Sequence, residues 1–187
     1  MSIMSAATGL PHGRPLTKAD LADVPEDGHR YELIDGTLIV SPAPKVRHQR
    51  AVRELMRLLL PVTAGDLELL TAPLDVALAD DTVIQPDIVI ARRADLTEHD
   101  LSGPPVLAIE VLSPSTRGVD LLLKRERLER AGCAHYWVVD PDEPAITAWS
   151  LGSDRRYGEP VQVSGHQEFT AAQPLVVTFR PADLLTP

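Results

Sequence analysis

Hydrophobic positions recur along the chain with two different periods, and the changes of period predict alternating helices and strands. Residues 29–40 alternate between apolar and polar side chains around an Asp-Gly pair, which is typical of two strands joined by a tight turn. In residues 46–60, apolar side chains recur at spacings of three and four, which is typical of one face of a helix. A shorter helix is expected over residues 17–23, where Thr17 is a favourable N-cap.

The middle of the chain is rich in β-branched residues and is expected to form most of the sheet. Residues 66–79 are predicted to be one strand, and a tight turn at residues 80–81 leads into a second strand that ends near residue 90. These two strands are expected to pair as an antiparallel hairpin. A polar loop over residues 92–104 then leads into the apolar run of residues 106–112, which predicts a further buried strand.

The second half of the chain continues the alternation. Good cap residues between Ser113 and Thr116 predict a helix that runs to about residue 131, and Gly132 is expected to end it in a left-handed conformation. Strands are predicted over residues 135–140 and 145–151. The helix connects the strand of residues 106–112 to the strand of residues 135–140, so these two strands should be parallel and joined by a right-handed crossover.

Together these elements predict an α/β fold in which one mixed β-sheet of about five strands forms a core flanked by α-helices. A length of 187 residues is sufficient for one domain with a real core. We expect that single domain over residues 17–187, preceded by a flexible N-terminal arm of residues 1–16. Residues 152–187 are expected to form a peripheral, strand-rich tail with one or two weak strands.

The composition is that of an ordinary globular protein. Hydrophobic residues make up 44% of the chain and charged residues 24%, which excludes global disorder. The N-terminus lacks the basic region and the long apolar segment of a signal peptide, and no stretch is long enough to span a membrane. We therefore expect a cytoplasmic protein with no membrane contact. The single cysteine, Cys133, is expected to be an inert, partly buried thiol.

The formal net charge of −9 argues against a tight, nonspecific nucleic-acid binder. Basic side chains nevertheless concentrate in residues 45–57 and 117–130, on or beside two predicted helices. Two interpretations are open: these are solvated helix faces, or they are surfaces that meet a polyanion. The second interpretation makes Arg50, Arg53 and Arg117 candidate substrate-binding residues.

Asp87 and Glu110 are the most informative acids, because each lies in an otherwise apolar, strand-like run. A buried ionised carboxylate costs several kcal/mol unless something compensates it. Two such acids on neighbouring strands indicate one shared compensator, and a divalent cation is the simplest one. The alternatives are that Asp87 is a turn acid after Pro86 and that Glu110 forms a buried salt bridge with Lys124 without a metal.

Several short motifs occur in a characteristic order along residues 17–151. Together they resemble the PD-(D/E)XK nuclease superfamily and, more closely, the Uma-two family of putative bacterial restriction endonucleases. The motifs are Tyr31-Glu-Leu-Ile-Asp-Gly36, Ser41-Pro-Ala-Pro44 with His48, Gln85-Pro-Asp87, Glu110-Val-Leu-Ser-Pro-Ser-Thr116, Lys124 and Tyr136-Trp-Val-Val-Asp-Pro141. The resemblance implies a restriction-endonuclease-like fold and an endonuclease that uses Mg²⁺ or Mn²⁺ to hydrolyse phosphodiester bonds in DNA.

The resemblance also implies a role for each acid. Asp87 and Glu110 are the expected main ligands of the metal, and Glu32 is expected to bind a second ion or to orient water. Lys124 is expected to stand beside the attacking water or to stabilise the transition state. His48 is a candidate substrate-binding residue.

The chain departs from the family's pattern at three positions. Leu112 stands where many members of the superfamily have their lysine, so the resemblance assigns that role to Lys124 on the following helix. Leu128 stands where a tyrosine is expected, and His135 where an acidic residue is more usual. All three carboxylates remain, so these departures concern fine tuning more than metal binding.

Other interpretations stay open from the sequence. Glu32 is also typical of a glutamate on a surface strand, and His48, beside Arg47 and Gln49, of a solvated helix histidine. The competing function is a catalytically inactive nuclease fold that serves as a binding module. A third is a structural homodimer whose acids pair across the interface. For the nuclease itself the resemblance implies a homodimer, so that two sites address two strands.

Overall fold

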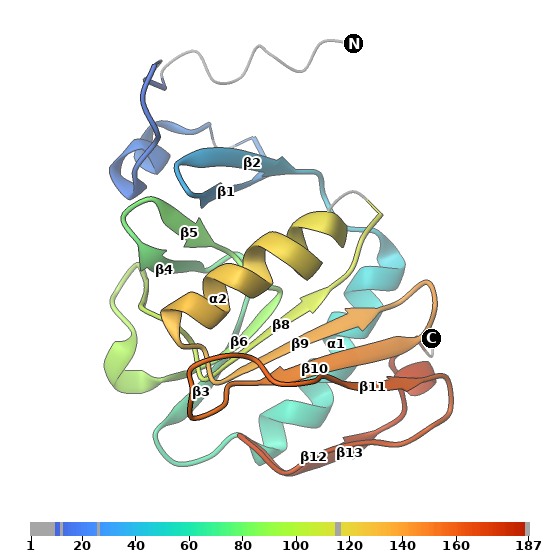
Figure 1. Ribbon diagram of the computed structural model, residues 1–187. Helices are drawn as coiled ribbons and strands as arrows, with labels where there is room; N and C mark the ends of the chain where they lie inside the picture. Colours follow the sequence, from blue (N-terminus) through green and yellow to red (C-terminus); the bar gives the residue numbers. More distant parts are fainter. Residues whose placement is uncertain (1–9, 12, 26, 115–116, 186–187) are drawn as a thin grey trace.

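The computed structural model describes residues 10, 11, 13–25, 27–114 and 117–185, and these form an α/β fold (Figure 1). The predicted α/β class is confirmed. The strands are divided, however, between a six-stranded sheet, a five-stranded sheet and a two-stranded ribbon, where the sequence predicted one sheet of about five strands. Residues 1–9 of the expected N-terminal arm, and Ser115 and Thr116 of the expected helix cap, lie outside the described residues.

The larger sheet has the strand order β11-β10-β9-β8-β6-β3. Its strands, in chain order, are β3 (Leu67–Thr71), β6 (Ile88–Arg92), β8 (Leu107–Val111), β9 (His135–Asp140), β10 (Ala145–Ser150) and β11 (Val161–Ser164). Strands β8 and β9 are parallel, as predicted from the helix that connects them, and the other neighbours are antiparallel. The sheet is therefore mixed, as expected.

The smaller sheet has the strand order β2-β1-β5-β4-β7. Its strands are β1 (Arg30–Ile34), β2 (Thr37–Ser41), β4 (Asp75–Ala79), β5 (Thr82–Ile84) and β7 (Asp100–Ser102). The predicted hairpin of β1 and β2 and the predicted hairpin of β4 and β5 are both confirmed. Strand β7 lies inside the segment that was predicted to be a polar loop, and it pairs in parallel with β4.

Two segments that were predicted as single strands each cross from one sheet to the other. Residues 66–79 divide into β3 and β4 around Pro73, and the following run divides into β5 and β6 around Pro86. Proline has no backbone N–H to donate to a ladder, so both positions interrupt the pairing. The second crossing contains Asp87, which consequently lies where the two sheets meet.

Helices cover both faces of the larger sheet (Figure 1). Helix α1 (Val46–Leu59) packs on one face, and η4 (Val119–Lys124), a π-helical segment, continues into α2 (Arg125–Ala131) on the other. Gly132 ends α2 with φ of +92°, as the sequence predicted. The short helical turns are η1 (Lys18–Asp23), η2 (Leu60–Val62), η3 (Arg93–Asp95) and η5 (Pro181–Leu185). Among the described residues, none of the helices has the length and hydrophobicity that a membrane span requires.

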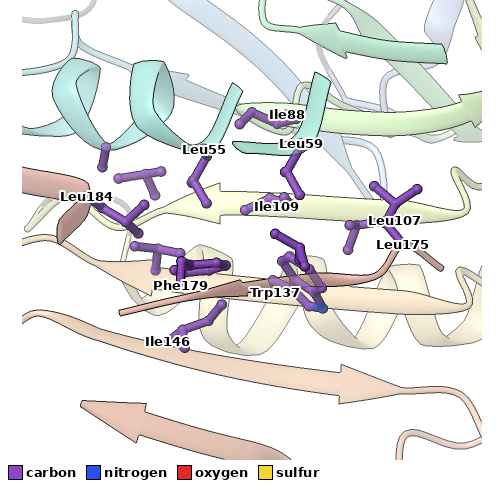
Figure 2. Close-up of a cluster of buried hydrophobic side chains, with 14 of the residues drawn as sticks. Leu55, Leu59, Ile88, Leu107, Ile109, Trp137, Ile146, Leu175, Phe179 and Leu184 are labelled. Atoms are coloured by element: carbon purple, nitrogen blue, oxygen red, sulfur yellow. The ribbon is translucent and has the colours of Figure 1, made fainter. Parts of the chain in front are cut away.

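The largest buried cluster fills the space between α1 and the larger sheet (Figure 2). Leu55 and Leu59 of α1 meet Ile109 of β8 and Trp137 of β9 there. Phe179 joins the same cluster from the ribbon of β12 (Phe169–Ala171) and β13 (Val177–Phe179). Part of the tail that was expected to be peripheral therefore covers the core.

A second cluster lies on the α2 side of the sheet, where Leu128 packs against Ala108 and Tyr136. Cys133 is completely buried in it, and burial raises the pKa of the thiol to about 12, which agrees with the inert thiol predicted from the sequence. Ala108 and Glu110 lie on this face of β8 because side chains alternate along a strand. Glu110 thus enters the site from the face that α2 covers.

The described part of the expected N-terminal arm packs against the smaller sheet. Leu10 and Leu16 are buried with Leu33 and Val83 in a third cluster. The Leu16 backbone N–H donates to the carbonyl oxygen of Gly36 at 2.9 Å, which ties the segment to the turn between β1 and β2. This turn directly follows β1, the strand that carries Glu32.

Candidate active site

Asp87 and Glu110 face each other across two adjacent strands. Ile88 pairs with Ile109 in the antiparallel ladder of β6 and β8, and the same register carried one step further sets Asp87 opposite Glu110. The Val111 backbone N–H donates to Oδ2 of Asp87 at 2.8 Å, which fixes this register at the site. Both acids line a pocket of about 190 Å³. The two acids on which the sequence analysis centred therefore line the same pocket.

Lys124 lies behind these acids and is surrounded by carboxylates. Its Nζ is 2.8 Å from Oε1 of Glu32, 2.9 Å from Oε1 of Glu110 and 3.4 Å from Oδ1 of Asp120. Only 1% of the Lys124 side chain is exposed. The salt bridge between Glu110 and Lys124 that was an alternative from the sequence is therefore present in the structure.

Glu32 is buried, so the interpretation as a surface glutamate is wrong. Strand β1 brings it to the junction of the two sheets, where its Oε1 accepts a hydrogen bond of 2.7 Å from the backbone N–H of Gln85. The same oxygen contacts Lys124. Glu32 reaches the acidic cluster through Lys124, and it does not line the pocket that Asp87 and Glu110 share.

Three donors hold the carboxylate of Asp87. Nη2 of Arg30 lies 2.8 Å from Oδ1, and Nε2 of His48 lies 3.0 Å from Oδ2, beside the Val111 amide. His48 comes from the first turn of α1 and is buried, so the solvated histidine expected as the alternative is wrong. An ionised Asp87 requires the proton of His48 on Nε2, since only that tautomer donates to it.

The two facing acids have opposite pKa shifts. Burial opposes ionisation of Asp87, but the hydrogen bond and charge of His48, the charge of Arg30 and the Val111 amide lower its pKa to about 2. For Glu110, burial raises the pKa well above the usual value, and the neighbouring acids add to the effect in spite of Lys124. Burial also disfavours the charged form of Lys124, yet Glu110, Glu32 and Asp120 raise its pKa. Such divergent shifts in adjacent groups are typical of functional sites.

The oxygen ligands of this acidic cluster are of the kind that a hard divalent cation prefers. The four carboxylates of Glu32, Asp87, Glu110 and Asp120 exceed the permanent positive charges of Arg30 and Lys124 by two. Burial is the main cause of the raised pKa of Glu110, and the negative charges of Asp120, Asp87 and Glu32 raise it further. Mg²⁺ typically uses one or two carboxylates with several waters, which Asp87 and Glu110 can supply at the pocket. Within the described residues, no group of three or more His, Cys, Asp or Glu side chains is arranged to hold a metal ion.

Of the lysine and arginine side chains in residues 45–57 and 117–130, Lys45 is the one that lines the pocket of Asp87 among the described residues. Arg53 pairs with Glu54, and Arg117 pairs with Asp140 beside a different pocket on the β9–β10 side. Neither Arg50 nor Arg53 lines the pocket of Asp87. Of the four side chains predicted to bind substrate, the structure brings only His48 into the cluster.

Two members of the cluster were missed by the sequence analysis. Asp120 is four residues before Lys124, which on a helix sets the two side chains on one face, and this spacing was a usable signal. Arg30 is two residues before Glu32, and side chains at this spacing share one face of a strand. This spacing does not show what Arg30 contacts, however, and only the fold reveals its ion pair with Asp87.

The three residues that depart from the family's pattern lie in the larger sheet or in the cluster beneath α2. Leu112 and Leu128 are buried in the apolar cluster beneath α2. His135 is half-buried at the start of β9, and its Nδ1 lies 3.1 Å from Oγ of Ser150. These positions are consistent with effects on packing rather than on the acidic cluster.

Comparison with known proteins gives a family and a fold. The family model described as "Uma2: Putative restriction endonuclease" matches residues 19–182. The structure is similar to the crystal structure of a putative nuclease belonging to DUF820 from Anabaena variabilis ATCC 29413, with a TM-score of 0.73 and 19% sequence identity over 91% of this chain and 98% of that one. This similarity confirms the fold class predicted from the sequence. No functionally curated protein matches the chain.

Proposed function

We propose that this chain, which belongs to the Uma2 family of putative restriction endonucleases, is a Mg²⁺- or Mn²⁺-dependent endonuclease that hydrolyses phosphodiester bonds in DNA. The observation that carries the proposal is the facing pair of Asp87 and Glu110 at the pocket. Their opposite pKa shifts and the excess of carboxylates support it, because a divalent cation would neutralise that excess.

In this proposal Asp87 and Glu110 hold the metal. A bound divalent ion polarises the phosphoryl oxygens and lowers the pKa of a coordinated water. His48, Arg30 and the Val111 amide keep the Asp87 carboxylate ionised and in one orientation. The contacts from His48 and the Val111 amide orient this ligand, and the loss of contacts of this kind normally weakens metal affinity or activity.

Lys124 and Glu32 act behind the metal ligands. Lys124 holds Glu110 in place from within the protein, and Glu32 in turn holds Lys124. The sequence interpretation made Glu32 a metal ligand or a water-orienting group. Its contacts with Lys124 and the Gln85 amide favour a supporting role for Glu32.

The decisive experiment is nicking of supercoiled plasmid DNA by the purified protein with Mn²⁺, with and without a chelator. We expect wild-type protein to nick only with the metal. Asp87→Asn and Glu110→Gln should remove the activity, and Asp95→Asn, at an exposed acid outside the pocket, should retain it. Nicking that survives Asp87→Asn would assign the activity to another site or to a contaminant.

A catalytically inactive binding module is the second candidate. The contacts that favour it are the ion pairs of Arg30 with Asp87 and of Lys124 with Glu110, which already compensate part of the acidic charge. Isothermal titration calorimetry with Mn²⁺ separates the two functions. Heat of binding that disappears in Asp87→Asn supports the nuclease, whereas its absence in the wild type supports a metal-free module.

We further propose that the protein acts in the cytoplasm as a homodimer. In a dimer with two-fold symmetry, two copies of this pocket would address the two strands of a duplex. Light scattering after size-exclusion chromatography measures the mass directly. A monomer at micromolar concentration would contradict this part of the proposal.

A further inference from the structure

Arg30 is the guanidinium that faces the open space in front of the acids. A second pocket, of about 420 Å³, adjoins the first and shares six lining residues with it: Arg30, Pro42, Ala43, Pro44, His48 and Asp87. Among the described residues, Arg30 is the only arginine that lines either pocket, and it lines both. The only lysine among them that lines either pocket is Lys45, in the first pocket.

Lys124 does not reach that space. Its side chain is 1% exposed, it lines neither pocket, and its ammonium points into three carboxylates. A phosphate in the pocket would therefore meet the acids before it met Lys124. The arginine differs, because 22% of its side chain is exposed beside Asp87.

The guanidinium of Arg30 has donors to spare. Nη2 donates to Oδ1 of Asp87, and Nη1 donates to the carbonyl oxygen of Gln85 at 3.1 Å. A guanidinium carries five N–H donors in a planar fork, and these two contacts within the described part of the chain use two of them. This fork matches two oxygens of a phosphate, which an ammonium cannot match in the same way.

We propose that Arg30 binds a nonbridging oxygen of the substrate's phosphodiester, and that Lys124 is a positioning residue that holds Glu110 and Glu32. This inference rests on the proposed nuclease function and deepens it, since it names the group that meets the substrate. It also reassigns a role, because the sequence interpretation made Lys124 the cation of the reaction.

The same geometry makes Arg30 a competitor of the metal. Its guanidinium occupies Oδ1 of Asp87, the carboxylate oxygen that the Val111 amide and His48 leave available. A divalent cation on Asp87 would be repelled by the adjacent positive charge. Removing Arg30 should therefore weaken phosphate binding and strengthen metal binding. A residue with a purely structural role would weaken both.

The experiment compares Arg30→Ala, Arg30→Lys and wild-type protein, with Arg180→Ala as the matched arginine control. Arg180 pairs with the exposed Glu168 on the tail and lines neither pocket. Fluorescence anisotropy measures binding of a short fluorescein-labelled DNA oligonucleotide, single-stranded and duplex, in Ca²⁺ and in chelator at one fixed salt concentration. Calorimetry measures binding of Mn²⁺ in the absence of DNA.

We expect Arg30→Ala to weaken oligonucleotide binding about tenfold or more and to tighten Mn²⁺ binding about tenfold. Arg30→Lys keeps the charge but not the fork, so it should weaken oligonucleotide binding while leaving Mn²⁺ affinity close to wild type. Arg180→Ala should change neither. If Arg30→Ala fails to fold in circular dichroism, Arg30→Lys carries the test.

Three outcomes would overturn the proposal: oligonucleotide affinity unchanged in the Arg30 variants, Mn²⁺ affinity lost in parallel with it, or no oligonucleotide binding by the wild type in either buffer. None of these measurements depends on cleavage. Plasmid nicking that fails while the opposite changes in affinity are observed would remove the hydrolase and leave the phosphate site. Nicking that succeeds while the affinities stay unchanged would support the hydrolase and refute the phosphate site at Arg30.

Discussion

Lys124 and Glu110 form a salt bridge of 2.9 Å in which both side chains are almost completely buried. The pair is not balanced, because Glu32 and Asp120 contact the same ammonium. A buried lysine compensates the charges of the three acids around it. Removing the lysine would leave those charges uncompensated and would destabilise the fold. This asymmetry leads to the first prediction.

Lys124→Met should destabilise the protein by about 3–5 kcal/mol, because it removes the shared cation and leaves the acids buried. Urea unfolding measures the change, and Lys45→Met, at an exposed lysine, is the control. Adding Mn²⁺ should stabilise Lys124→Met more than wild type, because the ion replaces lost positive charge. Equal stabilisation of both proteins by Mn²⁺ would contradict a cation site at these acids.

Glu110 should make stability decrease as pH rises. Its pKa in the folded protein lies above the ordinary value of 4.5, so the folded state holds this proton more tightly than the unfolded chain does. Its contribution is therefore complete below about pH 4.5 and is lost as the pH rises through the folded pKa. In Glu110→Gln, urea unfolding across this range should show a smaller decrease, and an unchanged slope would refute the assignment.

Asp87 acts in the opposite direction and at lower pH. Its pKa falls from 3.8 to about 2 on folding, so its contribution is present above about pH 4 and disappears as pH falls through about 2. In Asp87→Asn the acid limb of the stability profile should be flatter than in wild type. Retention of the full acid limb would mean that other carboxylates cause it.

His48→Ala should weaken Mn²⁺ binding by about ten- to a hundredfold, since a group that orients a metal ligand has effects of this size. The variant removes the donor to Oδ2 of Asp87 and leaves Arg30 and the Val111 amide. Calorimetry gives the affinity, and His99→Ala, at an exposed histidine, is the control. An affinity equal to wild type would show that the amide and Arg30 are sufficient to hold the carboxylate.

Gly36→Ala should destabilise the fold by roughly 1–3 kcal/mol. Gly36 has φ of +73°, and an added Cβ would lie 2.4 Å from Cβ of Pro15, so the turn before β2 and the N-terminal segment would both have to move. Gly118→Ala is the matched control, because nothing lies within 4 Å of its added Cβ and it precedes η4 in a helical conformation. It should be neutral or stabilising by about 0.5–1 kcal/mol. A Gly36→Ala midpoint equal to wild type in urea unfolding would contradict the packing of this segment.

Local patterns were sufficient for most of the elements. The helix of residues 46–59, the Asp-Gly hairpin and the glycine that ends α2 follow from side-chain period, turn chemistry and capping, which act over a few residues. Two buried acids with one lysine were also recognisable, because an acid in an apolar run is rare unless something compensates it. These properties depend on near neighbours in the chain.

The partners of those residues depended on contacts between distant segments. Pro73 and Pro86 divide two apparent strands between different sheets, and period alone does not report which strand is the neighbour. The contact of Arg30 with Asp87 spans 57 residues, and the burial of His48 arises because α1 begins beside the crossing at Pro86. Which cation faces the pocket and which lies behind the acids is a matter of three-dimensional position, and residue type and spacing do not contain that information.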